Sequence, residues 1–71
     1  MFGDEIGTIQ GVRAFDLHGV IYYDLAITFD DERTEDARLG SESVATGLKA
    51  GDRVRVMRAG FMIIQVAREQ D

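Results

Sequence analysis

The stretch that decides the fold is Val20–Phe29, with the sequence VIYYDLAITF. Every second residue of this stretch is apolar, and these residues are Ile21, Tyr23, Leu25, Ile27 and Phe29. Successive side chains of a β-strand point to opposite faces, so the alternation predicts a strand with one face in the core. Tyr22 falls on the opposite face of this strand.

Weaker patterns on both sides predict four more strands. A strand over 5–15, interrupted by glycines, comes first, and the turn Asp16–Gly19 leads from it into Val20–Phe29. A strand over 34–39 and a hairpin of 53–57 and 61–67 follow. Residues 41–46 are expected to form one helical turn, because Ser41 can cap its N-terminus and Gly47 can end it.

Five strands with one short helical turn predict an all-β fold, a small five-stranded barrel. Its topology is either the OB-type Greek key or an SH3-like barrel, and periodicity does not separate the two. The expected core is made of Ile21, Tyr23, Leu25, Ile27, Val54, Val56 and Ile64.

Length and composition limit the protein to one small domain, residues 1–71. The chain is compatible with a complete small protein or with a domain of a longer one. It contains no cysteine, which excludes disulfides and thiol chemistry and favours a reducing compartment. No stretch has the roughly 20 apolar residues of a membrane-spanning helix, and we expect a cytoplasmic protein.

Residues that carry catalysis or bind metals are scarce. The single histidine, His18, lies in a predicted turn, whereas zinc sites use three or four protein ligands. The acidic run of residues 30–36 lacks the central glycine and terminal glutamate of a calcium-binding loop. We therefore expect a non-catalytic protein that has neither a cofactor nor a metal site.

Charge is unevenly distributed along the chain, whose net charge is −5. Residues 30–42 carry six acidic and two basic residues, whereas residues 49–68 carry five basic residues and one acidic residue. The two segments could pair within the chain, join copies head to tail, or form a basic surface for an anionic partner. The candidate interaction residues are Tyr22, Arg53, Arg55, Arg58, Asp30 and Asp31.

The segment Leu48–Val56, LKAGDRVRV, resembles the entry into the fourth strand of OB-type modules. It is similar to that segment in the TOBE domains of transporter ATPases and in bacterial translation initiation factor one. Residues 7–9, 23–27 and 36–39 follow the order seen in such modules. The resemblance implies an OB-type architecture, and no functional residue of these families carries over to this chain.

These observations favour a non-catalytic module that mediates protein–protein contacts or self-association. The alternative is an OB-type domain that binds nucleic acid or a small anion, with Tyr22 for stacking and the three arginines for phosphate. The negative net charge disfavours both nucleic acid and an anionic membrane surface as partners.

Overall fold

The five strands follow the order expected from the sequence. The computed structural model, which describes residues 2–69, has the strands β1 (Phe2–Leu17), β2 (Val20–Phe29), β3 (Thr34–Gly40), β4 (Arg53–Ala59) and β5 (Met62–Arg68). The only helix in this part is the short 3₁₀ helix η1 (Ser41–Ser43) between β3 and β4. The prediction of an all-β fold with one short helical turn is thus confirmed.

The strands form one antiparallel sheet in the order β3-β2-β1-β4-β5. The first three strands are consecutive neighbours, and β4 then returns to the other side of β1, which is the strand order of a Greek key. The sheet does not close, so β3 and β5 remain its two edges, and the predicted barrel is not confirmed.

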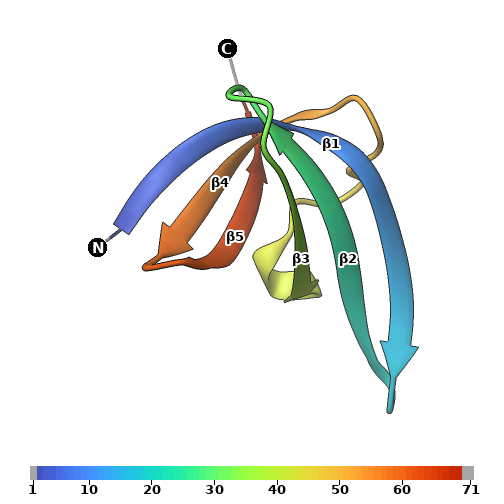
Figure 1. Ribbon diagram of the computed structural model, residues 1–71. Helices are drawn as coiled ribbons and strands as arrows, with labels where there is room; N and C mark the ends of the chain where they lie inside the picture. Colours follow the sequence, from blue (N-terminus) through green and yellow to red (C-terminus); the bar gives the residue numbers. More distant parts are fainter. Residues whose placement is uncertain (1, 70–71) are drawn as a thin grey trace.

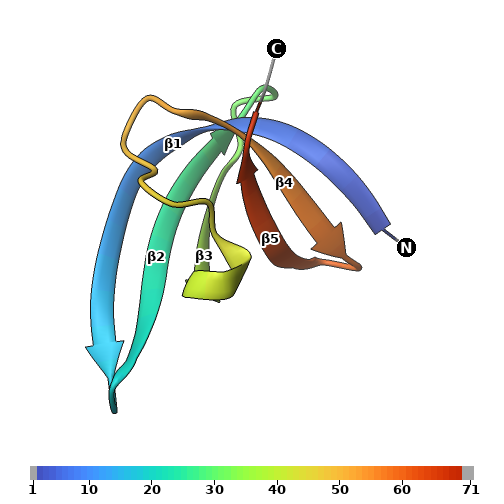
Figure 2. The same cartoon turned by 180° about the vertical axis from the view of Figure 1, so that it is seen from behind.

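Strand β1 is the longest element and belongs to both halves of the sheet. Its first part pairs with β4 through Phe2–Thr8, and its later part pairs with β2 from Gly7 to Leu17. The register shifts between Ile9 and Gly11, where one extra residue increases the local bend. Figure 1 shows β1 as an arch, and Figure 2 shows the same arch from behind with β5 and η1 beneath it.

The buried residues lie on the inner face of this arched sheet. They are Ile9, Leu25, Ile27, Phe29, Val54, Val56 and Val66. Four of the predicted core residues, Leu25, Ile27, Val54 and Val56, are among them. Tyr23 is half-buried and packs against the cluster.

Two residues expected in the core are exposed, so these predictions were wrong. Ile21 is exposed because the β1–β2 hairpin extends past the end of β3, which pairs with β2 only as far as Tyr22. Ile64 is exposed because the β4–β5 pairing shifts register between Met57 and Arg58. Ile63 packs against the core instead.

The open seam between β3 and β5 is partly filled by the segment that follows η1. Val44 forms a parallel bridge with Val66 of β5, and the Ala45 amide donates to the Val66 carbonyl at 2.9 Å. Gly40 precedes the helix, and no side chain caps it, so the expected Ser41 cap is wrong. No helix within residues 2–69 has the length and apolar character needed to span a bilayer.

Candidate functional site

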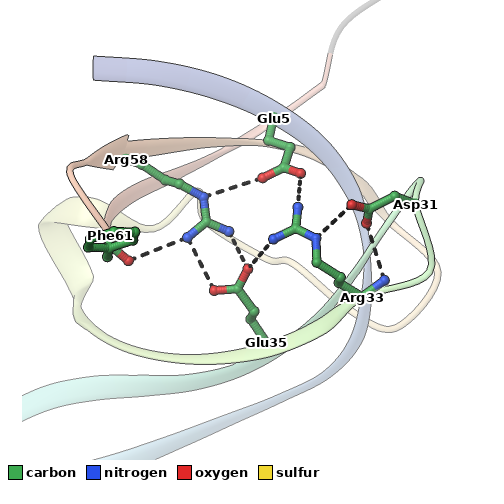
Figure 3. A network of polar contacts seen from close by, with 6 residues as sticks. All are labelled: Glu5, Asp31, Arg33, Glu35, Arg58 and Phe61. Carbon is green, nitrogen blue, oxygen red and sulfur yellow. Dashed lines mark hydrogen bonds and ion pairs between the residues drawn. The ribbon is translucent and has the colours of Figure 1, made fainter. Parts of the chain in front are cut away.

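A cluster of charged side chains joins β1, β3 and β4 on the inner face (Figure 3). Arg58 of β4 donates to both carboxylate oxygens of Glu35 on β3, with 3.1 Å between Nη1 and Oε1. Its Nε lies 3.3 Å from Oε1 of Glu5 on β1. Arg33, in the β2–β3 loop, bonds Glu5, Glu35 and Asp31. The cluster therefore links strands that are not neighbours in the sheet.

This cluster covers one end of the core. The guanidinium carbons of Arg33 and Arg58 each lie 5.1 Å from the centre of the Phe29 ring, and Phe29 itself is buried. Cations over an aromatic face are attracted by its quadrupole. Two arginines thus replace the apolar residues that would otherwise close this end of the sheet.

Hydrogen bonding between Glu35 and Arg58 favours the charged form of both side chains. The bond from Arg58 is the main reason why the pKa of Glu35 lies below its ordinary value, and burial opposes this shift. Glu35 in turn raises the pKa of Arg58. Both groups are therefore charged at neutral pH, and neither has the raised or lowered pKa near 7 that suits a general acid or base.

The predicted basic surface is divided between the two faces of the sheet. Arg53 and Arg55 point outward from β4, as expected, but Arg58 lies on the inner face with only 17% of its side chain exposed. The sequence placed Arg58 in the turn between the two arms of the hairpin, whereas it lies within β4. Strand β4 continues to Ala59, so Arg58 still follows the inward alternation of Val54 and Val56.

The two outward arginines form ion pairs within the chain. Arg53 donates to both oxygens of Asp30 at 2.9 and 3.1 Å, and this bond lowers the pKa of Asp30. Arg55 lies 3.1 Å from Glu69 and 3.5 Å from Asp4. Of the two predicted acidic partners, Asp30 thus contacts Arg53 directly, whereas Asp31 binds Arg33.

Tyr22 lies apart from all three arginines, on the outer face of the β1–β2 hairpin. It stacks on Phe15, with 5.9 Å between the ring centroids, and is half-buried. The Arg38 guanidinium lies over the Phe15 ring at 4.6 Å and bonds Asp24. Sequence reasoning missed Phe15, although its pairing with Tyr22 follows once the register of the hairpin is known.

A shallow depression of about 840 Å³ lies beside this stack on the outer face of β1, β2 and β3. Small residues at Gly11 and Ala26 leave it open, because they face each other across β1 and β2. Two arginines and two aspartates line it, namely Arg13, Arg38, Asp24 and Asp36. These charges cancel, so the depression has no preference for an anion.

Exposed apolar side chains gather at the tips of the two long hairpins. At the β1–β2 tip, Leu17 is 48% and Val20 51% exposed. At the β4–β5 turn, Phe61 is fully exposed and Met62 is 70% exposed. Arg58 of the charge cluster donates to the Phe61 carbonyl at 3.5 Å and so holds this turn (Figure 3).

Within the described residues, no group of three or more histidine, cysteine or carboxylate side chains could hold a metal ion. His18 lies in the β1–β2 turn with a φ of 54°, and its side chain is exposed. Within the acidic run, Asp30, Asp31 and Glu35 are held by arginines. Their carboxylates are thus already neutralised by protein cations.

No family model, no curated protein and no solved structure matches the chain.

Proposed function

We propose that this protein is a non-catalytic module of OB-type barrel architecture that binds protein chains through the apolar surfaces of its hairpin tips. The observation that carries the proposal is the contrast between its charged and apolar residues. Arg53, Arg55 and Arg58 are engaged in ion pairs within the chain. Leu17, Val20 and Phe61 are left exposed to solvent.

The strand order supports the OB-type architecture over the SH3-like alternative. OB-type barrels are five-stranded, partly open Greek keys, and here β4 returns to β1 to give that order. The short helix between β3 and β4 and the parallel bridge from Val44 to β5 lie where the seam of such a barrel would close. The open seam is partly filled by the segment around Val44 rather than by a strand ladder between β3 and β5.

Energetics favour the apolar residues as the source of binding. Burying a large apolar side chain contributes about 1.5–3 kcal/mol. An exposed ion pair contributes only about 0.2–1 kcal/mol, and an ion pair that already exists within the chain must be broken before either charge can serve a partner. Contacts through Leu17, Val20 and Phe61 therefore outweigh contacts through the arginines.

The same ion pairs weigh against the nucleic-acid alternative. Affinity for a phosphate backbone comes from cations that release its counterions. Here Arg53 is held by Asp30 and Arg58 by Glu35, while the chain as a whole carries a net charge of −5. Tyr22, the expected stacking residue, is already stacked on Phe15.

Self-association tests the proposal with the chain alone. Sedimentation velocity and light scattering from micromolar to millimolar concentration should detect assembly that persists at about 1 M salt, where screening reduces the reach of charges to about 3 Å. Replacing Leu17→Ser together with Val20→Ser should weaken this assembly. The control His18→Asn changes the same turn without removing apolar surface, and asparagine tolerates its positive φ.

A wild-type chain that stays monomeric at every concentration would refute this form of the proposal. An assembly that dissolves as salt rises and is unaffected by the Leu17 and Val20 changes would show that charges, not apolar tips, hold it together.

A further inference from the structure

We propose that two copies of this chain pair through the free edge of β1, residues 12–16, and form one continuous sheet across a two-fold axis at Ala14. The inference deepens the proposed function, on which it rests, by naming the partner and the contact. It follows from three features of β1, namely its unpaired edge, the direction of its backbone groups and the fit of its side chains.

The second half of β1 has a neighbour on one side only. Strand β4 pairs with β1 as far as Thr8, and Ile9 then bonds the backbone of Gly51 and Asp52. From Gly11 to Leu17, the pairing within the described residues is with β2 alone. Figure 1 shows this part of the β1–β2 hairpin extending away from β4 and β5.

The turn of the hairpin determines which backbone groups face the open edge. Leu17 pairs with Val20 around His18 and Gly19, whose φ angles of 54° and 84° are those of a type I′ turn. The pair that closes such a turn exchanges hydrogen bonds, and bonded and non-bonded pairs then alternate along the ladder. The amides and carbonyls of Val12, Ala14 and Asp16 therefore point away from β2, toward the free edge.

The other two edges of the sheet are less suited to pairing. The outer edge of β5 is occupied near Val66 by Val44 and Ala45. The edge of β3 faces the open seam, which the ion pair between Glu35 of β3 and Arg58 of β4 spans. Residues 12–16 carry two charges, Arg13 and Asp16, but contain no proline, no lysine and no register shift, which are other common protections of an exposed edge.

Side chains on the outer face of β1 fit those of a second, antiparallel copy. Pairing about Ala14 places Leu17 of one copy opposite Gly11 of the other. A Cβ added at Gly11 would meet nothing within 4 Å, so the space that Leu17 needs is open. Leu17 would thereby bury apolar surface that is now 48% exposed.

The same register suits the charges. Arg13 comes to lie opposite Phe15 of the other copy, an uncharged residue whose ring is already in contact with Tyr22 and Arg38 of its own copy. A pairing centred on Arg13 would oppose two arginines, which is destabilising. Asp16 lies opposite Val12, and the small Ala14 meets its own copy, so no like charges occupy directly opposite positions in this register.

A cysteine at position 14 tests the contact directly, because the chain has no other cysteine. Paired residues across a bonded antiparallel pair have Cα atoms about 5.5 Å apart. Disulfides span Cα separations of about 4.4–6.8 Å. Under mild oxidation, Ala14→Cys should therefore convert most of the chain to a covalent dimer. The control Asp36→Cys, on the β3 edge, should stay mainly monomeric.

A second variant keeps the test independent of disulfide formation. Gly11→Lys fills open space in its own copy but places a charge where Leu17 of the other copy packs. It should raise the dimer dissociation constant about tenfold or more, equivalent to about 1.4 kcal/mol. The melting temperature of the dilute monomer should change little.

The outcomes separate this inference from the proposed function. A chain that assembles, but neither crosslinks through Ala14→Cys nor weakens with Gly11→Lys, would overturn the inference and leave the proposed function standing. Equal crosslinking of Asp36→Cys would also overturn it. A wild-type chain that is monomeric at millimolar concentration would overturn both.

Discussion

Replacing Gly7 or Gly11 of β1 with alanine should have opposite effects on the stability of the fold. Gly7 is buried on the inner face, and a Cβ built there would lie 2.8 Å from Cγ2 of Ile27, 3.0 Å from the Thr28 carbonyl and 3.2 Å from the Phe29 ring. Gly11 has open space at the same position. Neither glycine has a positive φ, so alanine is compatible with the backbone at both sites.

The expected magnitudes follow from packing. Adding a methyl group to the filled site at Gly7 should force Ile27 and the β2 backbone apart, and overpacking of this kind costs about 1–3 kcal/mol. Gly11→Ala meets no such clash and should stabilise by about 0.4–1 kcal/mol, because alanine reduces the entropy of the unfolded chain. The two variants should thus differ by about 1.4–4 kcal/mol, or roughly 6–30 °C in melting temperature for so small a domain.

Urea and thermal unfolding followed by far-ultraviolet circular dichroism would measure this difference. Dilute solution is required, so that self-association does not contribute to stability. Gly7→Ala as stable as Gly11→Ala would refute the close approach of β1 to Ile27 and Phe29, and with it the bend of β1 over the core.

Two further predictions concern the core and the charge cluster. Leu25→Ala should destabilise the fold by about 2–5 kcal/mol, because Leu25 is buried. Val20→Ala, at the exposed hairpin tip, should change the stability by less than about 0.5 kcal/mol. Unfolding curves that show a larger loss for Val20→Ala than for Leu25→Ala would contradict the assignment of the core. Glu35→Gln should cost on the order of 1 kcal/mol at neutral pH. The pKa of Glu35 is lowered in the folded state, so the charged side chain stabilises the fold at pH values above its unfolded-state pKa, near 4.3. This stabilisation is lost as the pH falls from there through the folded-state pKa. The difference in stability between wild type and Glu35→Gln should therefore shrink in acid. A difference that widens in acid would contradict the role of Arg58. Asp36→Asn, on the outer face, is the matched control.

Periodicity predicted the strands well where both neighbours of a strand are present. Leu25 and Ile27 lie in the middle of β2, between β1 and β3, and both are buried as expected. Ile21 follows the same alternation but lies beyond the end of β3, so nothing covers it. Alternation shows which face a residue occupies, but not whether another element covers that face.

Register shifts explain the remaining errors in the core. The shift between Met57 and Arg58 brings Ile63 inward in place of Ile64, which the alternation of Met62, Ile64 and Val66 had favoured. Glycines at 7 and 11 did suggest an irregular strand. The sequence could not show that the shift lies next to Gly11 while Gly7 serves close packing.

The candidate site was predicted by residue type but not by arrangement. The uneven charge distribution drew attention to Arg53, Arg58 and Asp30, whose partners within the chain depend on the Greek-key return of β4. That connection brings Arg53 to Asp30 and Arg58 to Glu35, each pair being 23 residues apart in the sequence. Phe61, the most exposed large apolar residue within the described part of the chain, was expected in the strand 61–67 but lies in the turn before β5.

The arrangement of charges also explains why binding should depend on apolar surface. An open sheet lacks a hydrogen-bonded ladder between its edge strands, and Glu35 of β3 and Arg58 of β4 supply a link across that seam. A residue that holds the seam cannot also bind a partner without loosening the fold. The tip of the β1–β2 hairpin does not hold other strands together, since β3 and β4 end before it. Its free edge and its exposed Leu17 are therefore the parts of the molecule that can gain contacts at no cost to the fold.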